Sequence, residues 1–417
     1  MLAAKAPIAR FVLVGAMVAL GAILFLLAVR GHSEDGVAIY DPAPEYVWNR
    51  LYLALFVRTD AKGKQYGVDS LDPLYWSSTR HLLTGESETG GIRAMDQFLT
   101  GHGEKLVRDP LRRAVLQRDL WALFDWAATR NRWERMPVGE TAATALSQRL
   151  ADIIRRLALT KEQIGALPDN YAAAIASKAY PDAFDPNHPD RGFLPADLFL
   201  EDGPWVCVQM QRFPSLPAPV HTEQFGGRST FLIFVNLPGG RADTLAYLDK
   251  LNHFSEPWIF DRTRAEQLYK KSGLTLPAFP SQDGPWENPQ IPQLPVGTQF
   301  ALVRQALLVD DNGELVPTPL TESVQIRVYR AIEPGIADNH PQSVFEFELS
   351  RQNLFAGKAG GLREIGNEEK GFTTFLTVGI DPFEIKDTGP QTERMLNCIG
   401  LLPEEHVSAT FQRSQIG

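Results

Sequence analysis

An uncharged segment near the amino terminus constrains this chain more than any other feature. Nineteen consecutive residues, Phe11 to Val29, carry no charge, and they lie between Lys5 and Arg10 on one side and Arg30 on the other. An α-helix of that length spans about 28 Å, which nearly matches the hydrocarbon core of a bilayer at about 30 Å. The sequence therefore predicts a single helix that crosses a membrane once.

We expect this helix to be retained as an anchor. A cleaved secretory signal has a shorter apolar stretch followed by a small-x-small site, and here only Val29 and Gly31 offer such a pair. Two basic residues before the segment against one after it favour a cytoplasmic amino terminus. The prediction is a cytoplasmic tail at 1–10, an anchor at 11–29 and a linker at 30–40. The bulk of the chain then lies outside the cytoplasm, on the periplasmic side of a bacterial cell membrane.

Composition narrows the class of protein that follows the anchor. Apolar residues make up 44% of the chain and charged residues 22%, which are values of globular proteins. The net charge of −9 argues against a general nucleic-acid binder, because phosphate contacts require a surplus of lysine and arginine. Basic residues do gather at Lys105, Arg108, Arg112, Arg113 and Arg118. On a helix, that cluster indicates a solvated face.

The chain has two cysteines, Cys207 and Cys398. In an oxidising compartment they could form a disulfide across a long loop. Cys207 also lies in an apolar run, so a buried free thiol is an equally good interpretation. Two cysteines this far apart exclude covalently attached haem and a zinc ribbon, and we expect no cofactor.

Residues 41–178 predict a helical domain. Apolar residues recur at spacings of three and four after Asp109, and the same period returns from Thr141 onward. Several helices also have recognisable starts, in which a side chain can cap the free N–H groups of the first turn. These starts are Asp72-Pro73, Asp109-Pro110, Thr160 with Gln163, and Pro168-Asp169.

Residues 179–195 form an Asp- and Pro-rich loop, and the period changes to that of strands beyond it. We predict an α+β domain over 196–417, built on a mostly antiparallel sheet. Its expected strands are Val206 to Met210, Thr230 to Asn236, Gln299 to Val309, Ser323 to Tyr329, Ser343 to Leu349 and Phe372 to Val378. One helix is expected from about Arg241 to Asn252, a hairpin turn at Asp311-Asn312-Gly313, and an extended Pro-rich crossing segment at 277–295.

Two clusters contain residue types that bind metals or catalyse reactions. Asp182, Asp185, His188 and Asp190 could present oxygen and imidazole donors, and calcium prefers such loops. The alternate donor spacing, central glycine and terminal glutamate of an EF-hand loop are absent, so an Asx- and Pro-rich turn is favoured and no metal is expected.

The second cluster is His221 with Glu223, in a predicted loop between two strands. Loops of this kind often carry general acid–base groups. The pair also matches half of the zinc-deaminase pattern, but the Cys-x-x-Cys that this pattern needs is missing. Surface placement is the simpler interpretation, and these two residues are the weak catalytic candidates of the sequence.

Three tryptophans, Trp205, Trp258 and Trp286, each follow a proline. A rigid context of this kind could hold an indole ready to stack on a sugar, a peptide or a proline-rich ligand. Filling the core is the commoner role of tryptophan, and it is the alternative here.

These features favour a non-catalytic, membrane-anchored extracytoplasmic protein that binds an envelope protein or polymer. A first alternative is an extracytoplasmic hydrolase whose site combines His221, Glu223, Asp185 and His188, and this reading requires those side chains to meet in one cleft. A second alternative is an accessory subunit of a membrane redox or transport complex, with the anchor packed among other helices.

Overall fold

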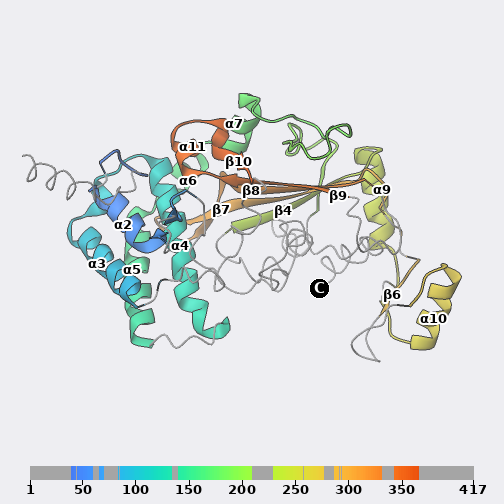
Figure 1. The fold of residues 1–417 in the computed structure, drawn as a ribbon, viewed down its shortest axis with the longest axis horizontal. Coiled ribbons are helices and arrows are strands. Elements are labelled where there is room, and N and C mark those ends of the chain that lie inside the picture. The colour runs from blue at the N-terminus through green and yellow to red at the C-terminus, as the bar shows by residue number, and fades with distance from the viewer. Residues whose placement is uncertain are drawn as a thin grey trace, which may run out of the picture.

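The computed structural model describes residues 39–43, 45–59, 65–69, 83, 85–133, 140–208, 229–256, 258–276, 286–290, 292, 294–330 and 342–365 (Figure 1). The predicted tail and anchor and the predicted strand at 372–378 lie outside these ranges. Within them, the structure contains no helix with both the length and the apolar character that a membrane crossing requires. The prediction of an anchor at Phe11 to Val29 is therefore not tested by it.

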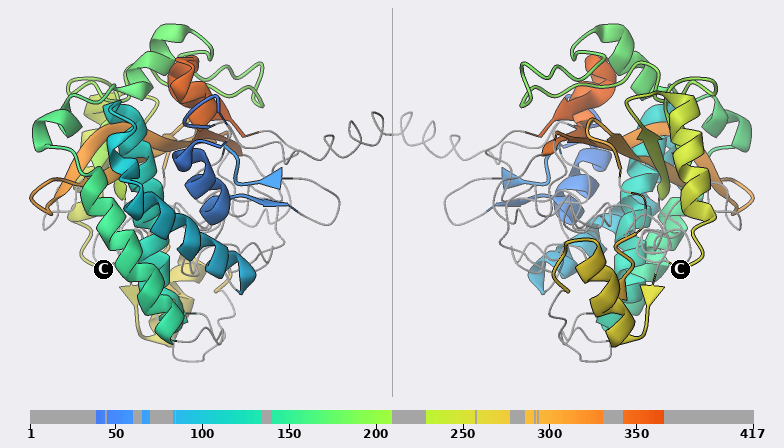
Figure 2. Two further views of the ribbon diagram at one scale, coloured as in Figure 1. Left: turned by 90° about the vertical axis from the view of Figure 1, so that its left-hand side faces the viewer. Right: turned by 90° about the vertical axis from the view of Figure 1, so that its right-hand side faces the viewer.

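Helices dominate the first part of the described chain, as the apolar periodicity predicted. They are α2 (Val47–Phe56), α3 (Glu86–Thr100), α4 (Pro110–Trp133) and α5 (Glu140–Leu157), with a 3-10 turn η1 (Gly103–Lys105) and a short hairpin of β1 (Arg58–Thr59) and β2 (Gln65–Tyr66). Figure 2 shows α4 and α5 running side by side. The helices predicted after Asp109 and from Thr141 are confirmed by α4 and α5.

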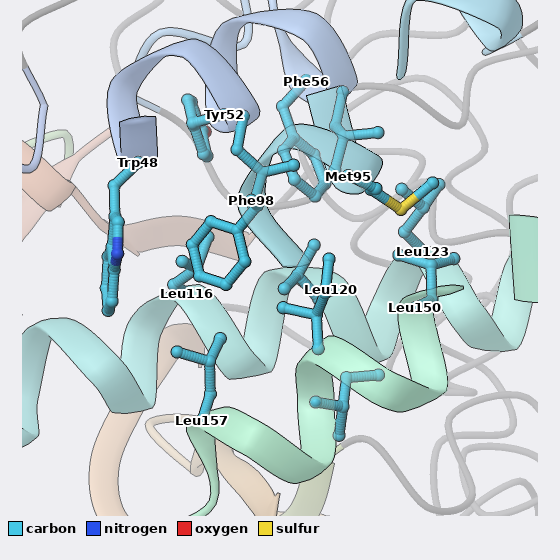
Figure 3. Close-up of a cluster of buried hydrophobic side chains, with 14 of the residues drawn as sticks. Trp48, Tyr52, Phe56, Met95, Phe98, Leu116, Leu120, Leu123, Leu150 and Leu157 are labelled. Carbon is cyan, nitrogen blue, oxygen red and sulfur yellow. The ribbon is translucent and has the colours of Figure 1, made fainter. Parts of the chain in front are cut away.

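The core of the helical part is aromatic on one side and aliphatic on the other (Figure 3). Trp48 and Tyr52 on α2 and Phe98 on α3 lie over leucines of α4 and α5, including Leu116 and Leu157. All five side chains are fully buried. Each fully buried large apolar side chain stabilises a fold by about 1.5 to 3 kcal/mol, so this cluster holds the four helices together.

The second part is built on one antiparallel sheet of six strands in the order β10-β9-β8-β7-β4-β3. The strands are β3 (Val206–Val208), β4 (Ser229–Asn236), β7 (Gln299–Val309), β8 (Leu315–Tyr329), β9 (Gln342–Leu349) and β10 (Leu362–Glu364). Every pair of neighbours in this sheet is antiparallel. The α+β class and the mostly antiparallel sheet are therefore confirmed for the described residues.

The β7–β8 hairpin turns where the sequence predicted it. Gly313 has φ +85°, which a residue without a Cβ adopts readily, and its N–H donates to the carbonyl oxygen of Asp310 at 3.0 Å. The Asp310 carboxylate also accepts hydrogen bonds from the backbone N–H groups of Asn312 and Glu314 at 2.9 Å and 2.8 Å. These bonds lower the pKa of Asp310 and fix the register of the hairpin.

β8 begins eight residues earlier than the predicted strand, at Leu315 rather than Ser323. Two prolines, Pro317 and Pro319, stand in the added part, and proline usually argues against a strand. The structure accommodates them beside an irregular stretch, because the β7–β8 register shifts around Gln305. Bulges of this kind are where proline is tolerated.

Two short helices predicted from their caps are confirmed, and both pack on the sheet. They are α6 (Lys161–Gly165), which begins with the capping box of Thr160 and Gln163, and α7 (Asn170–Ser177), which is capped by Asp169. The side-chain amide of Asn170 donates to the carbonyl oxygen of Thr321 on β8 at 3.0 Å, and the Thr321 N–H donates back to it at 2.6 Å. This reciprocal pair fixes α7 to one face of the sheet.

The remaining helices and short strands lie at the ends and edges of the sheet. Helix α9 (Arg241–Asn252) matches its predicted bounds and lies at one end of the sheet, opposite α4 (Figure 1). A small unit of β5 (Trp258–Ile259), α10 (Arg262–Lys271) and β6 (Trp286–Glu287) projects beyond it and has its own apolar cluster. On the other side, α11 (Arg351–Phe355) and η2 (Ala359–Gly361) connect β9 to β10.

Candidate functional site

The two faces of the sheet differ in chemistry because alternate residues of a strand point to opposite faces. On β8, Val324, Ile326 and Val328 join the apolar core under α7. Ser323, Gln325 and Arg327 belong to the other face, and all three are buried. We call the polar part of that face the charged face. Its members on β7, β8 and β9 are Arg304, Ser323, Gln325, Arg327, Glu346 and Glu348.

Glu322 lies next to the charged face, at the end nearest α4, and its carboxylate meets Arg304 there. It lies at the β-bulge, where β8 has one residue more than β7 between the pairs Arg304–Ser323 and Gln305–Thr321. Its carboxylate accepts a hydrogen bond from Arg118 on α4 and another, at 2.7 Å, from the hydroxyl of Ser229. The Nε atom of Arg304 lies 3.0 Å from the same carboxylate. Two cations and a hydroxyl thus compensate one buried acid.

A second buried ion pair joins α4 to α11. The Asp119 carboxylate accepts two hydrogen bonds from Arg351, one of them at 3.1 Å from Nε. Arg351 also donates to the carbonyl oxygen of Asp69 at 2.7 Å, and its guanidinium carbon lies 4.8 Å from the ring centroid of Tyr52. The Asp119 and Arg351 side chains are at most 1% exposed. The pair therefore links the two parts of the molecule in a dry interior.

The pKa shifts around this pair follow from burial and charge. Burial raises the pKa of Tyr40 well above its ordinary value, and the nearby Asp119 charge raises it further. For Arg351, burial is the largest cause and lowers the pKa, but the charge and hydrogen bonds of Asp119, together with Tyr52 and Tyr40, outweigh it and the net shift is upward. Both shifts keep Tyr40 neutral and Arg351 charged at neutral pH.

One sequence interpretation is corrected by this network. The sequence predicts that the basic cluster from Lys105 to Arg118 is a solvated helix face. This prediction is correct for Lys105 and Arg108, which are exposed. Arg118, however, is 4% exposed and bonded to Glu322. The helical period gives the angular position of a residue, but it does not show that a sheet with an acid lies against that position.

Arg327 differs from Arg304, the other buried arginine of the charged face, in that no carboxylate of the described residues forms an ion pair with it. Its side chain is fully buried, and its Nη1 atom donates to the hydroxyl of Tyr329 at 3.3 Å. Its Nε and Nη2 atoms have no hydrogen-bond partner among the described residues. Gln325 lies two residues earlier on the same face, and its Oε1 atom likewise has no hydrogen-bond partner among the described residues. Buried polar atoms are nearly always hydrogen-bonded, so these three atoms mark a candidate binding site.

The charged face also has an edge that reaches solvent. Val344 on β9 pairs directly with Arg327 in the sheet register and is partly exposed. Glu346 pairs with Gln325 and is therefore the diagonal neighbour of Arg327. Sequence reasoning did not find this site, although alternating Ser323, Gln325 and Arg327 within a predicted strand was a signal that one face of the sheet is polar.

The structure separates the four candidates for a metal site. The His188 ring and the Asp185 carboxylate lie 2.7 Å apart, and this hydrogen bond, followed by one from the Asn187 N–H, lowers the pKa of Asp185. Asp182 instead lies 3.8 Å from the ammonium of Lys178, and Asp190 is exposed. Within the described ranges, the structure holds no group of three or more His, Cys, Asp or Glu side chains arranged around one point.

The catalytic candidates His221 and Glu223 lie outside the described residues. The meeting of these two side chains with Asp185 and His188 in one cleft, which the hydrolase alternative requires, therefore stays a prediction.

Two of the three candidate stacking tryptophans are in the core. Trp205 and Trp286 are each 3% exposed, and the Trp205 indole N–H donates to the Asp197 carboxylate at 3.1 Å. Burial on this scale leaves little of either ring to stack on a ligand, and both fill apolar clusters. Trp258 lies on β5, where its backbone pairs with Glu287.

Cys207 lies on β3, half-buried, with its thiol free. Cys398 is outside the described residues, so the disulfide between them stays a prediction. Burial raises the pKa of the Cys207 thiol to about 11. A raised pKa leaves the thiol protonated below that value, and the protonated form is a poor nucleophile.

We therefore expect Cys207 to be alkylated slowly at pH 8. In the reduced native chain, iodoacetamide modification of the Cys207 peptide, followed by mass spectrometry, is expected to accelerate only as the pH approaches 11. The urea-unfolded chain is the control, because its thiol returns to an ordinary pKa. Equal rates in native and unfolded chains at pH 8 would contradict the expectation.

Comparison of the chain with protein-family models, with curated proteins and with solved structures finds no match in any of the three.

Proposed function

We propose that this protein is a non-catalytic binding protein, tethered to the cell membrane by one helix at Phe11 to Val29 and working on the extracytoplasmic side. Its binding site is the part of the charged face around Arg327. The partner is an envelope component that brings a negatively charged group to this arginine.

The observation that carries the proposal is the fully buried Arg327 with two open donor atoms. Placing a charge in a dry interior without a partner costs several kcal/mol, so folded proteins pair such groups. Arg118, Arg304 and Arg351 follow that rule with Glu322 and Asp119. Among the residues that the structure describes, Arg327 has no carboxylate partner, and a bound anion would supply one.

Two further observations support a binding role. The partly exposed Val344 beside Arg327 gives the site an edge that a partner can reach. The ion pairs at the α4 end hold the sheet in a fixed position against the helical part, and a preorganised site loses less entropy when it binds.

Photo-crosslinking in cells tests this function. The full-length chain would carry a benzophenone amino acid in place of Val344, and a matched chain would carry it in place of Leu200. Leu200 is 60% exposed and lies in the loop region that packs on the opposite face of the sheet. We expect crosslinked products in the envelope fraction from the Val344 position, and their loss when Arg327→Met is added.

An exposed arginine provides the control. The Arg155→Met change removes an arginine whose side chain is 76% exposed, and it is expected to leave the crosslinks unchanged. Should the Val344 position give no adduct, or give the same adducts as Leu200, the charged face is not a binding site and the proposal fails.

A further inference from the structure

We infer that the surface at the η1 turn docks onto anionic lipid headgroups of the membrane that the anchor crosses. The surface consists of Lys105, Leu106 and Arg108, and we call it the basic turn. The inference rests on the anchor of the proposed function and adds a second contact with the same membrane. A single point of attachment does not fix the orientation of a folded body, whereas two points restrict it.

The basic turn combines an exposed apolar side chain with exposed cations. Leu106 ends the η1 turn and is 54% exposed, and Lys105 and Arg108 on either side of it are exposed as well. Within the described ranges, the ion pairs of this segment use Glu104 and Asp109 with other partners, and neither Lys105 nor Arg108 forms one. Cations that meet headgroups, around an apolar side chain that enters the acyl boundary, are typical of a segment at a bilayer interface.

Acids on the elements around the basic turn lie beside arginines. The pairs are Glu104 with Arg156 at 3.8 Å, Asp109 with Arg112 at 3.9 Å, Asp96 with Arg149 at 2.7 Å and Asp152 with Arg155 at 3.8 Å. The acidic β7–β8 turn lies past the end of α5, where the Asp311 N–H donates to the carbonyl oxygen of Leu159 at 3.0 Å. Lys105 and Arg108 therefore remain as surplus positive charge, in a chain whose net charge is −9. An anionic surface complements that surplus.

The position of the basic turn favours the membrane over a soluble acidic partner. The described chain begins at Ile39, ten residues after the predicted anchor ends at Val29, and ten residues span at most about 33 to 36 Å. Tyr40 packs on Trp48 with ring centroids 5.5 Å apart, and the Trp48 indole N–H donates at 2.7 Å to the carbonyl oxygen of Gly103, where η1 begins. The basic turn is thus built onto the first residues after the anchor, within reach of the bilayer surface.

Phe260 marks a second exposed surface, which fits the membrane less well. Its side chain is 77% exposed, but it precedes α10 at the end of the molecule far from α2 (Figure 1). The two arginines of α10 are also paired, Arg264 with both carboxylate oxygens of Glu256 and Arg262 with Glu266 at 3.0 Å. Neither its position nor its charge therefore favours the bilayer as strongly as those of the basic turn.

Photo-crosslinking of the full-length chain in lipid nanodiscs tests the inference. A benzophenone amino acid replaces Leu106 in one chain and Leu200 in another, because Leu200 is 60% exposed but stands beside Glu201 and Asp202. The discs contain phosphatidylcholine alone or an equal mixture with phosphatidylglycerol. We expect the Leu106 position to form adducts with phosphatidylglycerol and the Leu200 position to form few. In 1 M salt most of the Leu106 adducts are expected to disappear, because the Debye length falls to about 3 Å.

Two charge variants separate the basic turn from the overall charge of the chain. Lys105→Gln with Arg108→Gln is expected to reduce the Leu106 adducts by about tenfold or more, because each cation near an anionic surface strengthens the contact by about fivefold. Lys270→Gln with Lys271→Gln removes the same charge from exposed positions on α10 and is expected to change nothing. Since all four side chains are exposed, both variants are expected to fold as wild type, which circular dichroism checks.

Several results would overturn the inference. If the chain inserts into the discs but the Leu106 position forms no lipid adduct, or forms the same adducts without phosphatidylglycerol, the basic turn does not bind anionic lipid and the anchor stands. Equal loss of adducts in the α10 variant would show an effect of overall charge. Leu106 adducts in cells that contain protein or polysaccharide instead of lipid would assign the surface to another partner. A chain that does not insert into the discs removes the anchor, and with it the proposed function.

Discussion

Replacing Asp119 with alanine is expected to destabilise the fold by about 3 to 5 kcal/mol, because the change leaves a buried arginine without its carboxylate. Arg351 donates two hydrogen bonds to Asp119 and is fully buried. Urea unfolding of wild type and Asp119→Ala, followed by tryptophan fluorescence and circular dichroism, gives the difference in the free energy of unfolding.

An exposed ion pair provides the control. Asp152 lies 3.8 Å from Arg155, and the two side chains are 59% and 76% exposed, so Asp152→Ala is expected to cost about 1 kcal/mol or less. The double variant Asp119→Leu with Arg351→Met removes both charges together. It is expected to lose at least about 1 kcal/mol less than the sum of the two single changes. Equal losses for Asp119→Ala and Asp152→Ala would show that the buried pair is not a stabilising link.

Trp48→Ala is expected to cost about 3 to 5 kcal/mol, the range for removing a large buried aromatic side chain. The indole is fully buried, with ring centroids 5.5 Å from Tyr40 and 6.0 Å from Phe98. Its N–H donates to the Gly103 carbonyl oxygen at 2.7 Å. Gly103 allows this approach, because a Cβ there would lie 2.5 Å from the Phe98 ring. Thermal and urea unfolding measure the loss.

The Trp48→Phe variant separates the ring from the hydrogen bond. It keeps most of the apolar volume but removes the indole donor, while the Leu106 N–H still donates to the Gly103 carbonyl oxygen at 3.1 Å, so we expect a loss of about 0.5 to 1.5 kcal/mol. A phenylalanine variant as unstable as Trp48→Ala would show that the hydrogen bond, and not packing, accounts for the whole effect. An alanine variant as stable as wild type would show that Trp48 does not join α2 to the η1 turn.

The elements predicted correctly are those specified by short stretches of sequence. The capping box of Thr160 and Gln163 forms between residues three apart, and α9 begins directly after the turn residues Pro238-Gly239-Gly240. The β7–β8 turn is fixed by Asp310 and Gly313 within four residues. Local hydrogen bonds and backbone preferences decide such features, so they can be inferred without knowing the rest of the fold.

The elements that were missed depend on distant neighbours. The early part of β8 is a strand although it contains Pro317, because Leu307 on β7 pairs with it next to a bulge. Helix α10 was not predicted. Its apolar residues pack against Trp286, which lies on the separate strand β6. Neither partner can be identified from the local sequence, since register and packing arise only when the sheet assembles.

By itself, the sequence determined the α+β class, the helices from Pro110 to Leu157, five of the six strands of the sheet and the expectation of a membrane anchor. Only the tertiary structure decided which charges are buried and with what partners. Arg118 and Glu322 are 204 residues apart in the chain, and Asp119 and Arg351 are 232 apart. A charged side chain has the same local signature in solvent and in the core, so only the folded neighbours distinguish a solvated arginine from Arg118 in its pair or from Arg327 with its open donors.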